Sequence, residues 1–111
     1  MNYRLYSINM DVSEICKKIF NIAEPYAQNN DSPISYINIE FGFNVGISEE
    51  DLWSTFNKIR WDTILSSAEL FIIRRPFNGN IDNSIKVTSL ALFEDEEGFM
   101  PKIPIKNGLL T

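Results

Sequence analysis

Histidine is absent from this 111-residue chain, and that absence restricts its chemistry more than any other feature of the composition. Imidazole is the commonest general base near neutral pH and the commonest metal ligand. The chain also has one cysteine, Cys16, so it cannot form an intramolecular disulfide, and this fits a reducing compartment. Because zinc needs about four Cys, His or carboxylate ligands, the sequence predicts no metal site and no cofactor.

Long apolar runs and an excess of basic charge are missing as well. No stretch approaches the roughly 18 consecutive apolar residues of a membrane span, and residues 1–10 contain no apolar run typical of a signal peptide. The 10 basic and 15 acidic residues give a net charge of -5, which opposes nucleic-acid binding because that requires a basic surface. We therefore expect a soluble, cytoplasmic protein with no membrane or nucleic-acid partner.

The residues that are present predict one folded domain, since 44% are hydrophobic and 13% are aromatic. Its centre starts with residues 37–43, whose apolar side chains alternate with other residues as in a half-buried strand. Gly46 offers a turn, and Ser48 with Asp51 forms the capping pattern of a helix start. Apolar residues at helical spacing extend this helix to about Arg60.

Two further elements are predicted before this centre. Residues 3–8 alternate like a short strand. Asp11 caps a helix with a wide apolar face. Because the ring of Pro25 clashes with the preceding turn and removes a helical hydrogen bond, this helix should kink there or end near Glu24.

Two strands are predicted after the centre, at residues 68–75 and 85–93. The dipeptide Asn78-Gly79 lies between them and is a hairpin signal, so we expect these two strands to pair. Residues 98–111 contain two prolines and cannot form a regular helix. We expect them to be an irregular tail outside a domain that spans residues 1–97.

This element order predicts an α+β fold, a two-layer sandwich. Two helices would pack on one face of a three- to four-stranded mixed or antiparallel sheet, in the order (β)αβαββ. The other face would carry Tyr36, Asn38 and Glu40. That face should be solvated or should meet a partner.

The chain also carries an ordered set of short motifs. They are the first-helix residues Ile15, Cys16, Ile19, Ile22, Ala23 and Glu24, then Glu40-Phe41-Gly42, Gly46-Ile47-Ser48-Glu49-Glu50, Leu52 with Phe56, Thr63-Ile64, Ala68 with Leu70 and Ile72, and Ser89-Leu90-Ala91-Leu92. This set resembles the HypA-type nickel chaperones of hydrogenase and urease maturation, over about residues 10–93. The resemblance implies a shared scaffold and a protein–protein role in metal-centre assembly.

The metal-binding parts of that family are replaced in this chain. The family binds nickel through a Met-His-Glu start, and the matching positions here are Met10, Asp11 and Val12, inside the chain. The family's zinc module with paired Cys-x-x-Cys is replaced by residues 74–83, which contain no cysteine. The resemblance therefore implies the scaffold without metal delivery.

Two groups are candidates for catalysis. Cys16 falls in the first turn of a helix, where the dipole lowers a thiol pKa, yet its position belongs to an apolar stripe. Glu40 and Asp62 are candidates for an acid–base pair, but no motif fixes their separation. We favour a packed core thiol and no catalytic activity.

Acidic runs are the most distinctive charged features, and with one tryptophan they are the candidate partner-binding residues. These are Glu49, Glu50, Asp51, Trp53, Glu94, Asp95, Glu96 and Glu97. Each feature also has a structural explanation. Residues 49–51 stabilise their own helix through its dipole. Residues 94–97 can prevent pairing at a strand edge, and Trp53 can belong to the core or its boundary. As a binding surface, acids and an exposed tryptophan fit a basic protein.

Two functional hypotheses follow from these features. The first is a small acidic, metal-free, non-catalytic protein-binding module of the immunity or inhibitor type. It would neutralise a basic partner such as a nuclease toxin by presenting carboxylates where the toxin binds phosphates. The alternative is a divergent HypA-like accessory protein of nickel maturation that has lost metal binding. An enzyme ranks last.

Overall fold

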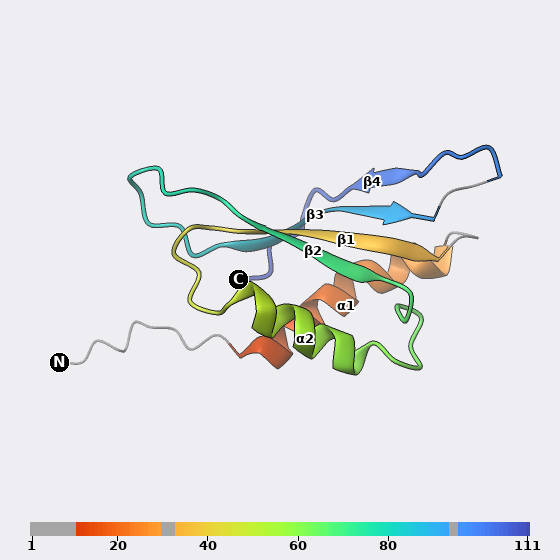
Figure 1. The fold of residues 1–111 in the computed structure, drawn as a ribbon, viewed down its shortest axis with the longest axis horizontal. Helices are drawn as coiled ribbons and strands as arrows, with labels where there is room; N and C mark the ends of the chain where they lie inside the picture. The colour runs from red at the N-terminus through yellow and green to blue at the C-terminus, as the bar shows by residue number, and fades with distance from the viewer. Residues whose placement is uncertain (1–10, 30–32, 94–95) are drawn as a thin grey trace.

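A computed structural model describes residues 11–29, 33–93 and 96–111 (Figure 1). The elements are α1 (Val12–Asn29), β1 (Ile34–Phe41), α2 (Glu49–Ile59), β2 (Glu69–Arg74), β3 (Ile85–Leu92) and β4 (Lys102–Pro104). Both helices lie on one face of a four-stranded mixed sheet, so the predicted α+β sandwich is confirmed. The strand predicted at residues 3–8 lies outside the described residues.

The strand order is β2-β1-β3-β4, and it corrects one prediction. β2 runs parallel to β1, and β3 runs antiparallel to β1 on its other side, so the predicted pairing of β2 with β3 is wrong. The reason is that α2 carries the chain across the sheet and sets β2 parallel beside β1, as helical crossovers do. Residues 75–84 then pass the end of β1 as a long loop, in which Gly79 has a φ of 95°.

The two helix starts form as the sequence predicts. The side chain of Asp11 accepts a hydrogen bond of 2.9 Å from the Ser13 N–H at the start of α1. Ser48 is the N-cap of α2, where its Oγ accepts a bond of 3.0 Å from the Asp51 N–H. Each bond satisfies one of the amide donors that a helix start leaves without an internal partner.

α1 does not end near Glu24, which was one of the two outcomes expected from Pro25. The helix continues to Asn29 with Pro25 inside it, on an exposed position. Ala23 and Ala27 lie on the buried side of this last part of the helix. Their packing against the core offsets the hydrogen bond that the proline removes.

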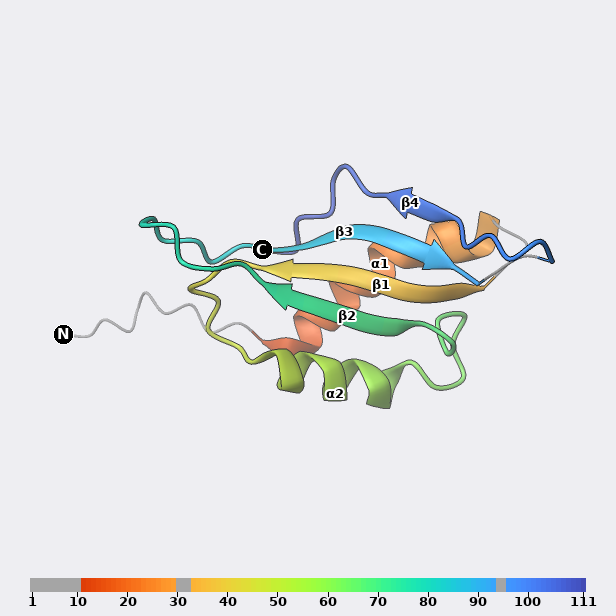
Figure 2. The ribbon, with the colours of Figure 1, turned by 45° about the horizontal axis from the view of Figure 1, so that its top comes forward.

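The core lies between the helices and one face of the sheet. β1 supplies the buried side chains of Ile37, Ile39 and Phe41, and α2 supplies Leu52 and Phe56. Each fully buried aliphatic or aromatic side chain contributes about 1.5–3 kcal/mol to the hydrophobic stabilisation. The alternate residues of β1 are less buried and lie on the opposite face of the sheet. Figure 2 shows this face, which no helix covers and which is here called the open face.

The C-terminal segment is part of the sheet layer and not an irregular tail. β4 pairs with β3, and the Leu110 N–H donates to the Ile85 carbonyl at 2.7 Å. Leu110 itself is 1% exposed. The predicted tail therefore contributes a strand and a core side chain.

Candidate partner-binding surface

Two of the predicted acidic residues of α2 lie beside the edge strand β2. Glu49, Glu50 and Trp53 from α2 and Leu70 and Ile72 from β2 line a groove of about 260 Å³, here called the α2–β2 groove. The groove forms because α2 packs antiparallel to β2 at the side of the sheet, so that its first two turns face this strand (Figure 1). Aromatic, aliphatic and carboxylate side chains therefore meet there.

Glu49 is engaged in an internal ion pair. The guanidinium of Arg74 donates to both carboxylate oxygens of Glu49, at 3.0 and 2.9 Å. These bonds hold the pKa of Glu49 below its usual value. Arg74 also donates to the carbonyls of Val45 and Ile47, so the pair fixes the turn before α2. Glu49 therefore has a structural role in positioning the groove.

Glu50, Asp51 and Trp53 remain available to a partner. Both carboxylates are exposed, and neither forms an ion pair within the part of the chain that the structure describes. Trp53 is 47% exposed, so it is one of the large apolar side chains that the fold leaves accessible to solvent. Of these three, Glu50 and Trp53 line the α2–β2 groove, whereas Asp51 lies on the same helix outside it.

The second predicted acidic run does not join this surface. Glu94 and Asp95 lie outside the described residues, and Glu96 and Glu97 are exposed beyond the end of β3. β3 is antiparallel to β1, so the end of β3 lies beside the start of β1. α2, in contrast, begins after the end of β1. Figure 2 shows the two places at opposite ends of the sheet.

An aromatic surface on the open face continues from β2 and was not predicted as a site. The rings of Tyr36 and Phe71 lie 6.4 Å apart and, with Met100, they border a hollow of about 320 Å³. Phe71 is 55% and Ile73 is 53% exposed. Sequence patterns showed that Tyr36 faces away from the core, but the edge position of β2 depends on the strand order.

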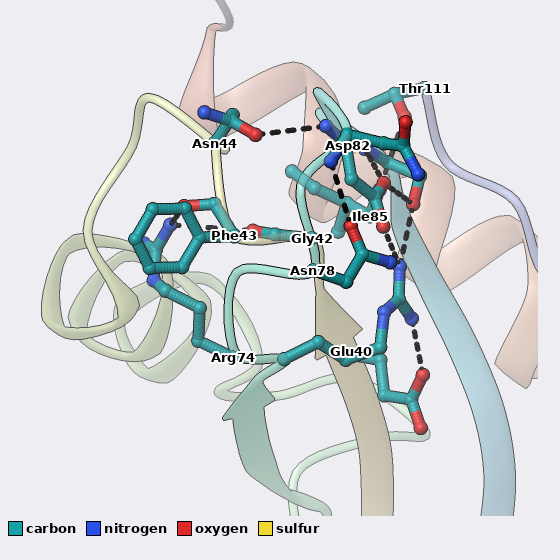
Figure 3. Close-up of polar contacts among 12 residues, drawn as sticks. Glu40, Gly42, Phe43, Asn44, Arg74, Asn78, Asp82, Ile85 and Thr111 are labelled. Atoms are coloured by element: carbon teal, nitrogen blue, oxygen red, sulfur yellow. Dashed lines mark hydrogen bonds and ion pairs between the residues drawn. The ribbon is translucent and has the colours of Figure 1, made fainter.

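A polar cluster at the end of β1 holds the loop of residues 75–84 in place (Figure 3). Arg75 pairs with Glu40 and with Asp82, each at 2.5 Å. Asp82 also accepts the Ser84 N–H and hydroxyl, and these bonds with Arg75 hold the pKa of Asp82 far below its usual range. The Asp82 N–H in turn donates to Asn44 Oδ1 at 2.9 Å. The polar groups of the cluster thus satisfy one another and connect the loop to β1.

The two candidates for catalysis are not assembled into a site. Glu40 pairs with Arg75 near the end of β1, whereas Asp62 follows the far end of α2, so the structure does not bring these carboxylates together. Cys16 is 0% exposed, and burial raises the pKa of its thiol to about 11. A nucleophilic thiol needs a lowered pKa, so Cys16 has the properties of a core thiol.

Among the described residues, no group of three or more His, Cys, Asp or Glu side chains is arranged to hold a metal ion. No helix in residues 11–29, 33–93 and 96–111 is long and apolar enough to span a membrane. No protein-family model, curated protein or solved structure matches the chain. The resemblance to HypA-type chaperones stays a prediction.

Proposed function

We propose that this protein is a metal-free, non-catalytic protein-binding module of the immunity or inhibitor type, which neutralises a basic partner such as a nuclease toxin. The observation that supports this most is the α2–β2 groove, where the exposed ring of Trp53 lies beside carboxylates. Tryptophan is enriched among the residues that contribute most to binding energy in protein interfaces. Carboxylates around such an anchor select a basic partner.

The two kinds of side chain have different roles in this proposal. Glu50 and Asp51 are exposed, so water and salt screen them, and they act mainly on the rate of encounter with a basic surface. Trp53 loses its contact with water when a partner covers it, and this burial supplies binding energy. The proposal therefore requires association that is fast at low salt and weakens as salt is added.

The test uses purified basic nuclease domains of bacterial toxins and a matched pair of charge variants. E50K/D51K changes the groove carboxylate Glu50 and its neighbour in the first turn of α2. E96K/E97K makes the same change in net charge at the other end of the sheet. We expect E50K/D51K to raise the Kd about tenfold or more and to abolish inhibition of the nuclease. Equal weakening by both variants would show that net charge alone drives binding, and the proposed surface would be wrong.

A second candidate function rests on the motif order described above. We propose it as a HypA-like accessory role in nickel maturation, based on a resemblance that spans α1 to β3 in chain order. It would be tested with purified hydrogenase and urease maturation proteins as partners, together with metal analysis of the protein. Stoichiometric nickel or zinc would contradict the metal-free part of both proposals. Binding to those maturation proteins with no binding to nucleases would favour the second role.

A further inference from the structure

We infer that the partner binds by adding a β-strand to the outer edge of β2. The inferred occupant is an extended segment of a basic protein in which lysine or arginine alternates with apolar residues. This inference rests on the function proposed above and specifies how that surface holds its partner. Three features of β2 support the inference: its position at the edge of the sheet, the direction of its peptide groups, and the carboxylates beside it.

The two edges of the sheet differ in how they are protected. β4 has three residues, is preceded by Pro101 and ends at Pro104, and so it offers little backbone for pairing. β2 has six residues, Glu69–Arg74, and contains neither proline nor lysine. Natural proteins usually protect an edge strand by shortness, proline, lysine or a covering element. β2 therefore has the features of an edge that another strand can join.

The direction of the peptide groups along β2 follows from one bond. The Arg75 N–H donates to the Phe41 carbonyl of β1 at 2.8 Å. Since peptide groups alternate in direction along a strand, those of Phe71 and Ile73 also face β1, and those of Leu70 and Ile72 face outward. No described residue forms a hydrogen bond with these outward groups. A strand added there would pair with them, as in other cases of β-strand addition.

The side chains on both sides of this edge indicate the chemistry of the occupant. On the helix side, an added strand would meet Trp53 and Glu50 in the α2–β2 groove. On the open face it would meet the exposed side chains of Phe71 and Glu69. The cation that β2 itself contributes, Arg74, is already paired with Glu49. Apolar contact areas flanked by unpaired carboxylates fit a segment that alternates basic and apolar residues.

A second copy of the chain is a poorer occupant. Two β2 edges joined about a twofold axis would place the exposed Glu50 and Glu69 of both copies along one seam. Like charges that face each other across paired strands are destabilising. A basic partner segment therefore fits this edge better than a second copy of the chain does.

The test is amide hydrogen exchange on the full ¹⁵N-labelled chain, with a synthetic peptide of alternating lysine and valine as the probe. We expect the peptide to slow exchange at Leu70 and Ile72 by about tenfold or more, while Phe71 and Ile73 stay protected in both states. A peptide with glutamate in place of lysine should have no effect. Peptide binding without added protection at Leu70 and Ile72 would overturn strand addition.

A pair of variants separates this inference from the proposed function. Ile72→Pro removes the isoleucine side chain and the outward N–H group, and it breaks no hydrogen bond to β1. Ile72→Ala also removes most of the isoleucine side chain but keeps the N–H group. Using a nuclease domain that binds the wild type, we expect I72P to bind about tenfold more weakly than I72A. If I72P does not fold, exchange on the wild type remains the deciding measurement.

The other possible results distinguish failure of strand addition from failure of the proposed function. Equal binding by I72P and I72A, together with loss of binding by E50K/D51K, would overturn strand addition and leave the proposed function standing. No binding to the peptide or to any nuclease domain would count against both. A dimer at low salt with protection at Leu70 and Ile72 in the absence of peptide would assign the edge to a second copy and overturn the inference.

Discussion

At the scale of single residues, Cys16 shows how the fold decides chemistry that sequence position leaves open. The sequence suggests a first-turn thiol that the helix dipole favours as a thiolate, but Cys16 is the fifth residue of α1 and lies in its second turn. The apolar stripe that contains Cys16 turns into the core, and burial there raises the pKa of the thiol instead. Desolvation disfavours the charged thiolate, and this is the cause of the raised pKa.

This burial predicts how the thiol reacts. We expect a thiol reagent at pH 8 to label Cys16 at the rate at which the protein opens, orders of magnitude more slowly than the chain in denaturant. Labelling followed by absorbance, with and without guanidinium, gives both rates. Rapid labelling of the folded protein would show an accessible thiolate and would bring catalysis by Cys16 back into consideration.

The pair of Glu49 with Arg74 predicts a pH dependence of stability. The folded-state pKa of Glu49 lies below its unfolded value of about 4.3, so the stabilisation is fully present above that value and is lost as the pH falls through the folded pKa. We expect E49Q to lower the free energy of unfolding at pH 7 by about 1 kcal/mol or less, because the carboxylate is partly exposed and screened.

Denaturant unfolding at pH 7 and pH 3 would measure this effect. The difference between wild type and E49Q should shrink at pH 3. E50Q is the matched control, since it removes the next carboxylate, for which the described residues supply no ion pair. A pH dependence that E49Q and E50Q alter equally would contradict the role assigned to the Arg74 pair.

At the scale of elements, the sequence predicts local features such as helix caps, but it does not predict which strands pair. Ser48 and Asp51 place the start of α2 correctly because a cap is formed by neighbours in the chain. Asn78-Gly79 does form a turn region, but it cannot specify which strand lies beside β3, since that depends on the crossover through α2. Leu70 and Ile72 could be predicted as apolar strand residues, but not as residues of an edge.

The C-terminal segment provides a prediction at this scale. A Cβ on Gly108 would lie 2.0 Å from the Val87 carbonyl oxygen, where β3 and the last residues pair. We expect G108A to lower the free energy of unfolding by about 2 kcal/mol or more, since the backbone must separate. G46A is the matched control, because a Cβ there has no atom within 4 Å.

Thermal and denaturant unfolding of both variants would test whether the last residues belong to the folded unit. G46A should change the free energy of unfolding by less than about 1 kcal/mol. If G108A is as stable as G46A, Leu110 and its segment contribute little to the domain, and the description of this segment as part of the sheet layer would be wrong.

At the scale of the whole molecule, the negative charge of the protein affects how the edge strand β2 is protected from pairing with another strand. β4 is protected by its shortness and by prolines, whereas β2 contains neither proline nor lysine and has Glu50 and Glu69 beside its edge. The sequence predicts the net charge, but only the strand order shows that part of it lies along one edge. Those carboxylates can both repel a second copy and attract a basic segment.

This connection predicts self-association when the charge is removed. We expect E50Q/E69Q to form dimers or larger species in sedimentation velocity at about 0.01 M salt, where the Debye length is about 30 Å and the wild type stays monomeric by repulsion. E14Q/E96Q makes the same change in net charge outside β2 and the α2–β2 groove and should remain a monomer. If both variants associate equally, the net charge of the protein, and not the charge beside β2, keeps the copies apart. If neither variant associates, the β2 edge does not pair with another strand, and the inference of strand addition loses its support.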